Sequence, residues 1–97
     1  MAAVREIEIE ASPAEVWEAL ATEHGRERWL DEGQEILVES EQQPRRLVWW
    51  WWHEDQRPTR VEFILEAVSR GTRVIVIESE PSVPVAALRA HFALVLA

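Results

Sequence analysis

Two side chains in this sequence are of the types that transfer protons, Glu78 and His53. Glu78 follows Val74 and Val76 at the two-residue spacing of a strand and would share their apolar face. A carboxyl group beside an apolar cavity can act as a general acid or base. The structural alternative, which we favour, is that Glu78 reaches the end of the sheet and meets water or an arginine. His53 has no coupled partner in the sequence, so both residues are weak candidates for a catalytic role.

Composition excludes several kinds of site. The 97 residues include no Cys, and all 10 basic residues are Arg. Disulfides, thiolate nucleophiles, zinc–thiolate sites and lysine Schiff bases are therefore excluded. No pair of histidines has the spacing of metal ligands, and no glycine-rich phosphate loop occurs. We expect neither a metal site nor a cofactor.

The net charge of the chain indicates which kinds of partner it can bind. The 18 acidic and 10 basic residues give a formal charge of −8, which repels nucleic acid and anionic membranes. No stretch has the length of a membrane span or the apolar core of a signal peptide. We therefore expect a cytoplasmic protein that binds neither nucleic acid nor membranes.

A run of four consecutive tryptophans is the strongest binding signal. It belongs to an apolar stretch, residues 47–52, whose length suits a buried strand. Because side chains alternate along a strand, Trp49 and Trp51 share one face. Trp50 and Trp52 share the other. Both faces of this strand need a covering layer, which other elements have to provide.

The first half of the chain predicts a strand and two short helices. Residues 5–11 alternate between apolar and acidic side chains, which is typical of a half-buried antiparallel strand. Ser12 and Glu15 form a capping-box pattern that predicts a helix over residues 13–22. A second short helical piece, residues 25–30, would bring Trp29 inward.

The second half predicts a meander and a final helix. Four strands are expected, at residues 34–40, 46–53, 60–68 and 72–80. The helix is expected over residues 82–97, with one apolar stripe formed by Val85, Leu88, Phe92 and Val95. These elements describe a single α+β domain, residues 1–97, whose curved antiparallel sheet wraps the last helix.

Several stretches resemble a known family. Residues 5–20 with Trp29 shortly after, and residues 44–49, 59–65 and 71–79, are similar to the bacterial proteins named for homology to the activator of the heat-shock chaperone ATPase. These proteins belong to the START-like, Bet v 1-like (SRPBCC) superfamily. The resemblance implies a helix-grip fold, in which an antiparallel sheet curls around a long C-terminal helix and encloses an apolar cavity.

The resemblance also implies a shortened sheet. The family has two more strands after the short helices, where this chain has only residues 30–33. An open sheet edge is therefore expected at residues 34–40, free to pair with another chain. The strand order implied by the family is 34–40, 46–53, 60–68, 72–80 and 5–11.

The family pattern places one face of the tryptophan strand on the concave, helix-facing side. Trp49 and Trp51 would lie there, either as a wall for a flat apolar ligand or as core filling. The candidate ligand-binding residues are Trp17, Trp29, Trp49, Trp51, Phe63, Leu65, Val76, Glu78, Leu88 and Phe92.

The opposite face of the strand would then be convex and exposed. Trp50 and Trp52, with Leu37, form a candidate interface with a second copy of the chain, because exposed aromatic rings usually mark interfaces. The alternatives are that arginine side chains cover the two rings or that the two faces are reversed.

Three functions fit these patterns. The first is binding of a hydrophobic or aromatic small molecule between the sheet and the C-terminal helix. The second is a protein-interaction module, homodimeric or chaperone-associated. The third, which has the least support, is an enzyme of the cyclase or dehydratase kind that uses Glu78 or His53.

Overall fold

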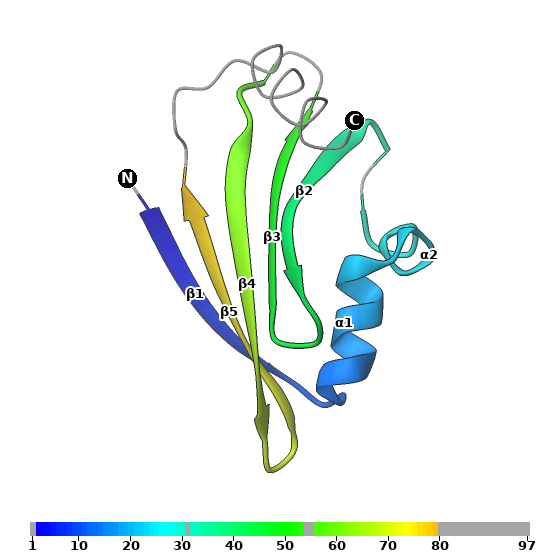
Figure 1. Ribbon diagram of the computed structural model, residues 1–97, viewed down its shortest axis with the longest axis vertical. Helices are drawn as coiled ribbons and strands as arrows, with labels where there is room; N and C mark the ends of the chain where they lie inside the picture. The colour runs from blue at the N-terminus through cyan, green and yellow to red at the C-terminus, as the bar shows by residue number, and fades with distance from the viewer. Residues whose placement is uncertain (1, 31, 54–55, 80–97) are drawn as a thin grey trace.

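Five strands form one antiparallel sheet, and two short helices connect the first strand to the second (Figure 1). The computed structural model describes residues 2–30, 32–53 and 56–79. The helices are α1 (Pro13–Ala21) and α2 (Glu23–Arg26). The strands are β1 (Ala2–Ile9), β2 (Gln34–Gln42), β3 (Arg46–His53), β4 (Thr59–Val68) and β5 (Gly71–Ser79).

The strand order is β1-β5-β4-β3-β2, which confirms the order expected from the family. The first strand of the chain lies beside the last described strand, with Ile7 opposite Val74. Among the described strands, β1 and β2 therefore form the two edges of the sheet. The strand bounds match the predicted ones or differ from them by up to three residues, and the helix predicted over residues 82–97 lies outside the described residues.

Helix α1 begins where the capping box predicts. Ser12 Oγ accepts a hydrogen bond from the Glu15 amide at 3.2 Å, and Glu15 Oε1 accepts one from the Ser12 amide at 3.2 Å. Thr22 ends this helix and starts the next, because its Oγ1 accepts a hydrogen bond from the Gly25 amide at 2.9 Å. A Cβ at Gly25 would lie 2.1 Å from the Glu18 carbonyl oxygen, so only glycine allows α2 to pack this closely on α1.

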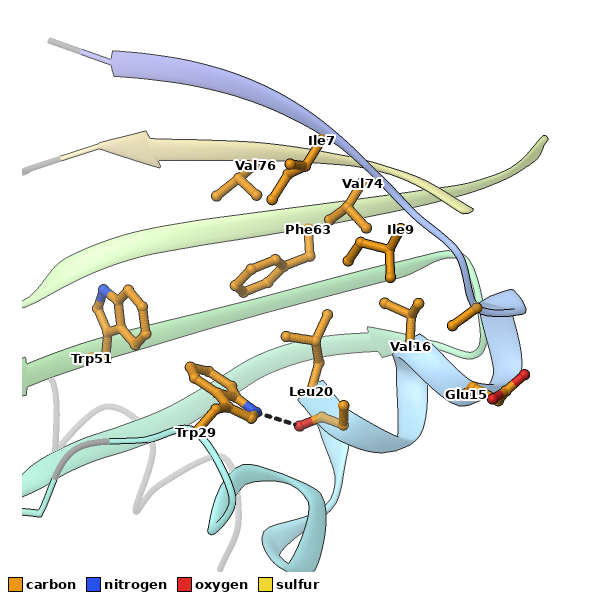
Figure 2. Close-up of a pocket in the computed structure, with 12 residues that line it drawn as sticks. Ile7, Ile9, Glu15, Val16, Leu20, Trp29, Trp51, Phe63, Val74 and Val76 are labelled. Atoms are coloured by element: carbon orange, nitrogen blue, oxygen red, sulfur yellow. Dashed lines mark hydrogen bonds between the residues drawn. The ribbon is translucent and has the colours of Figure 1, made fainter. Parts of the chain in front are cut away.

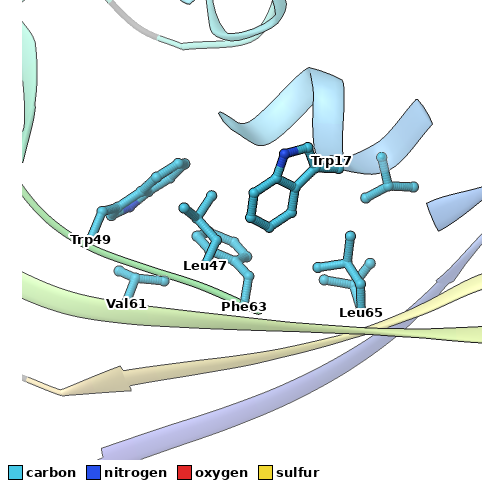
Figure 3. Close-up of a cluster of buried hydrophobic side chains, with 8 residues drawn as sticks. Trp17, Leu47, Trp49, Val61, Phe63 and Leu65 are labelled. Atoms are coloured by element: carbon cyan, nitrogen blue, oxygen red, sulfur yellow. The ribbon is translucent and has the colours of Figure 1, made fainter. Parts of the chain in front are cut away.

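The core lies between α1 and one face of the sheet (Figure 3). Its buried residues are Val16, Trp17, Leu47, Trp49, Val61, Phe63, Leu65 and Val74. Trp49 is fully buried and meets Phe63 edge to face, with ring centroids 4.8 Å apart. Trp51 is partly buried against the same cluster. The prediction that Trp49 and Trp51 share one face of β3 is confirmed, and this face packs against α1.

Trp50 and Trp52 lie on the opposite face, but the expectation that they are exposed is wrong. Their exposed fractions are only 9% and 4%. Each indole Nε1 donates to a carboxylate of the neighbouring strand, Trp50 to Glu39 at 3.0 Å and Trp52 to Glu35 at 2.6 Å. Arg60 lies opposite Trp50 in register and pairs with Glu39 at 2.7 Å. The arginine cover that the sequence left as an alternative is thus present at Trp50.

The open edge β2 carries features that oppose pairing with another strand. Glu35, Glu39 and Glu41 are exposed along it, and its register shifts between Val38 and Ser40, as at a β-bulge. Charged side chains and bulges are the usual means by which proteins protect an edge strand.

Candidate functional site, an apolar groove between helix α1 and the sheet

A groove of about 340 Å³ opens between α1 and the part of the sheet formed by β1, β5 and β4 (Figure 2). Its floor consists of alternate side chains of neighbouring strands. Val76 lies opposite Phe63 on β4, and Val74 lies opposite Ile7 on β1. The alternation that predicted these strands therefore also places their apolar side chains together on the groove side.

The groove walls come from α1, from the turn that follows α2 and from β3. On one side, α1 contributes Val16, Ala19 and Leu20. At one end, Trp29 and Trp51 close the wall (Figure 2). The walls and floor are thus formed almost wholly by aliphatic and aromatic side chains, as in most small-molecule sites.

Large apolar side chains are left uncovered at this place. The exposed fractions are 53% for Ile7, 39% for Ile9 and 41% for Trp29, and all three residues line the groove. Contiguous exposed apolar surface of this kind usually marks a binding site. Val4 is exposed by 66%, but it lies on the other face of β1.

Trp29 is held in place from two sides. Its Nε1 donates a hydrogen bond to the Ala19 carbonyl oxygen at 2.7 Å, shown as a dashed line in Figure 2. Its ring stacks on Trp49 with centroids 6.2 Å apart and an interplanar angle of 18°. Trp29 therefore separates the buried core from the groove and presents an aromatic face that is fixed before any ligand binds.

Glu15 is the ionisable side chain among those that line the groove, and its carboxylate has partners within the chain. Its Oε1 accepts hydrogen bonds from the amide of Ser12 and, at 3.0 Å, from Ser12 Oγ. The carboxylate of Glu15 is thus hydrogen-bonded within the capping box. The described lining offers apolar contact and shape, without an acid–base pair.

The structure distributes the predicted ligand-binding residues between the groove and the core. Trp29, Trp51, Phe63 and Val76 line the groove. Trp17, Trp49 and Leu65 lie in the buried core instead, so the interpretation of Trp49 as core filling holds. Leu88 and Phe92 lie outside the described residues.

Glu78 and His53 are not brought together. Glu78 lies opposite Val61, which in turn lies opposite Trp49, and His53 lies four residues beyond Trp49 along β3. The His53 ring lies near Gly33, where an added Cβ would be 3.2 Å from His53 Cε1. Neither candidate lines the groove, so the described site contains no general acid–base residue from the sequence prediction.

Sequence reasoning missed the residues that make the groove accessible. Ile7 and Ile9 were recognised as the inner face of the first strand but not as site residues. The signal was available, because the expected strand order already placed residues 5–11 beside residues 72–80. Ala19 and Leu20 of α1 lie across the groove from that strand pair, and the sequence analysis did not name them as site residues either.

The described residues were searched for metal sites and for membrane-spanning helices. In residues 2–30, 32–53 and 56–79, no His, Asp and Glu side chains gather in a group that could hold a metal ion. Within the same ranges, none of the helices has the length and apolar character needed to cross a membrane. The cytoplasmic location remains a prediction from the sequence.

Solved structures share this architecture. Protein MLL2253 from Mesorhizobium loti is 22% identical with a TM-score of 0.69, over 93% of this chain and 82% of that one. The Aha1 dimer from Colwellia psychrerythraea is 19% identical with a TM-score of 0.69, over 99% and 90%. CalU16 from Micromonospora echinospora is 23% identical with a TM-score of 0.65, over 79% and 57%.

No family model and no curated protein sequence matches the chain. At these identities the structural likeness establishes the fold and nothing about activity. The strand order, the two short helices after the first strand and the likeness to Aha1 and CalU16 together show that the described residues have the α+β fold of these structures, an antiparallel sheet with two short helices after its first strand.

Proposed function

We propose that this protein binds a hydrophobic or aromatic small molecule in the groove between α1 and the sheet. The observation that carries the proposal is the exposure of Ile7, Ile9 and Trp29 around one apolar groove of about 340 Å³. This volume lies at the lower end of the range of small-molecule sites, roughly 300–1,000 Å³. The fold supports the proposal, because it sets a helix against a curved sheet and leaves a space between them.

We propose that the C-terminal residues cover the groove. The sequence of residues 82–97 has an apolar stripe that includes Leu88 and Phe92. We place this stripe over the groove as a helix, as the resemblance to helix-grip proteins implies. Replacing Phe92 with Ser would then weaken ligand binding, whereas Ala97→Ser at the chain end would leave it unchanged.

A fluorescence titration with phenylnaphthylamine, an uncharged apolar probe, tests the proposal. The wild-type protein should enhance probe emission saturably. Ile7→Glu would place an unpaired carboxylate in the groove and should weaken binding by about tenfold or more. Val4→Glu is the matched control, because it adds the same charge to the same strand on the other face.

The outcomes of this titration are distinct. Equal weakening by Ile7→Glu and Val4→Glu would show that the probe does not use the groove. Absence of saturable binding by the wild-type protein, and by other apolar probes, would remove the proposed function.

Self-association is a second candidate. The structurally similar protein from Colwellia psychrerythraea was solved as a dimer. In this chain, Trp50 and Trp52 are already covered, and β2 bears acidic side chains, so the convex interface with Leu37 rests only on the sequence prediction. Light scattering after size exclusion tests it: twice the monomer mass supports a homodimer, and a monomer at high concentration contradicts it.

A further inference from the structure

We infer that the groove selects uncharged ligands and excludes anionic ones such as carboxylated lipids. This inference rests on the proposed function and specifies the chemical class of the ligand. It follows from the described side chains that line the groove, none of which carries a positive charge.

None of the described side chains that line the groove is basic. The charged residue in the lining is Glu15, whose sign is the same as that of an anionic ligand. Moving an ionised group from water into an apolar site without a partner costs far more than the apolar contacts of a small ligand return. An anion would therefore lose its hydration and gain no compensating contact.

Two arginines, Arg26 and Arg5, lie next to residues that line the groove but are not part of its lining. Arg26 donates from Nη1 to the Leu20 carbonyl oxygen at 3.0 Å and lies 5.8 Å from the centre of the Trp49 ring, in the layer next to the lining. Arg5 lies opposite Val76 within β1, where it is exposed and shares a strand face with Ile7, two residues further along. Neither guanidinium belongs to the lining.

The polar atoms of the walls reinforce this selection. The indole Nε1 of Trp29 is bonded to the Ala19 carbonyl oxygen, and the Glu15 carboxylate is bonded to Ser12. The nitrogen of Trp51 lies on the edge of its ring that faces away from Phe63 and Leu20 (Figure 2). The interior of the groove thus presents hydrocarbon, and the formal charge of −8 adds repulsion of anions at longer range.

Two fluorescent probes that differ by one sulfonate test the inference on the 97-residue protein. Phenylnaphthylamine is uncharged, and anilinonaphthalenesulfonate is the corresponding anion. The uncharged probe should bind at least about tenfold more tightly than the anion. Displacement of one probe by the other establishes whether the two share a site.

A single substitution should reverse this preference. Ile7→Lys would place a cation in the groove at a position that is already half exposed. The anionic probe should then bind within about threefold of the uncharged one. Val4→Lys adds the same charge on the other face of β1 and should leave the wild-type ratio unchanged.

Two results would overturn the inference while leaving the proposed function intact. The first is an anionic probe that displaces the uncharged one and binds the wild-type protein equally well; loss of that binding in Arg5→Gln would identify Arg5 as the anion anchor. The second is an equal change of the ratio by Ile7→Lys and Val4→Lys. A wild-type protein that binds neither probe would instead refute the proposed function.

Discussion

The carboxylate of Glu39 accepts three hydrogen bonds on the face of the sheet that carries Trp50 and Trp52. It accepts hydrogen bonds from Trp50 Nε1 at 3.0 Å, Arg60 Nε at 3.1 Å and Arg60 Nη2 at 2.7 Å. The hydrogen bonds from Arg60 lower the pKa of Glu39 below its ordinary value of 4.5, and the bond from Trp50 lowers it further, against the opposing effect of burial. This one residue therefore joins β2, β3 and β4.

Protonation of Glu39 should weaken the fold at low pH. Because the folded-state pKa lies below the ordinary value of 4.5, the stabilisation is complete above that value and is lost as the pH falls through the folded pKa. The free-energy difference between wild type and Glu39→Gln, from urea unfolding, should therefore shrink between about pH 6 and about pH 3.

A matched variant isolates this effect. Glu41→Gln removes an exposed carboxylate from the same strand. Its difference from wild type should change less with pH than that of Glu39→Gln. A Glu39→Gln difference that is the same at both ends of the pH range would contradict the role of this carboxylate.

At the level of elements, the start of α1 sets one wall of the groove. The capping box fixes where the helix begins, and hence which of its side chains face β1 and β5. Ser12→Ala removes this cap and should cost about 1 kcal/mol in the free energy of unfolding, measured with urea.

Ser69→Ala is the control for this prediction. Ser69 is exposed in the turn between β4 and β5 and caps no helix. Its effect on the free energy of unfolding should stay within about 0.5 kcal/mol. Equal effects of the two substitutions would show that the cap does not position the helix.

Much of this element structure could be predicted from the sequence. Alternation along residues 5–11, and apolar side chains at every second position from Val61 to Leu65, give the inward faces of β1 and β4, because the period of a strand is two. The capping residues give the start of α1, and the family order gives the neighbours of each strand. Trp51, Phe63 and Val76 reached the groove through the same alternation.

The cover over Trp50 and Trp52 could not be predicted by the same means. Alternation along a strand places Glu35 and Glu39 on the same face of β2 as Leu37, but which ring each carboxylate meets depends on the register of β2 against β3. That register includes a shift between Val38 and Ser40 that the side-chain pattern does not reveal. Burial was therefore underestimated on this face.

The whole molecule has one face covered by helices and one covered by its own cross-strand pairs. On the convex side, ion pairs such as Arg46–Glu62 and Arg60–Glu39 lie across the strands. On the other side, α1 buries the half of the sheet next to β3 and leaves Ile7 and Ile9 of β1 exposed (Figures 1 and 2). The groove is the result of this unequal cover.

Methyl NMR of the 97-residue protein during a phenylnaphthylamine titration tests the central claim most directly, because it locates the ligand. The aromatic probe should shift the methyl signals of Ile7, Ile9 and Val76, which line the groove. Ile75 and Ile77 point to the opposite face of β5 and should not move. Shifts confined to Ile75 and Ile77, or no saturable shift in any of these methyl groups, would contradict the account.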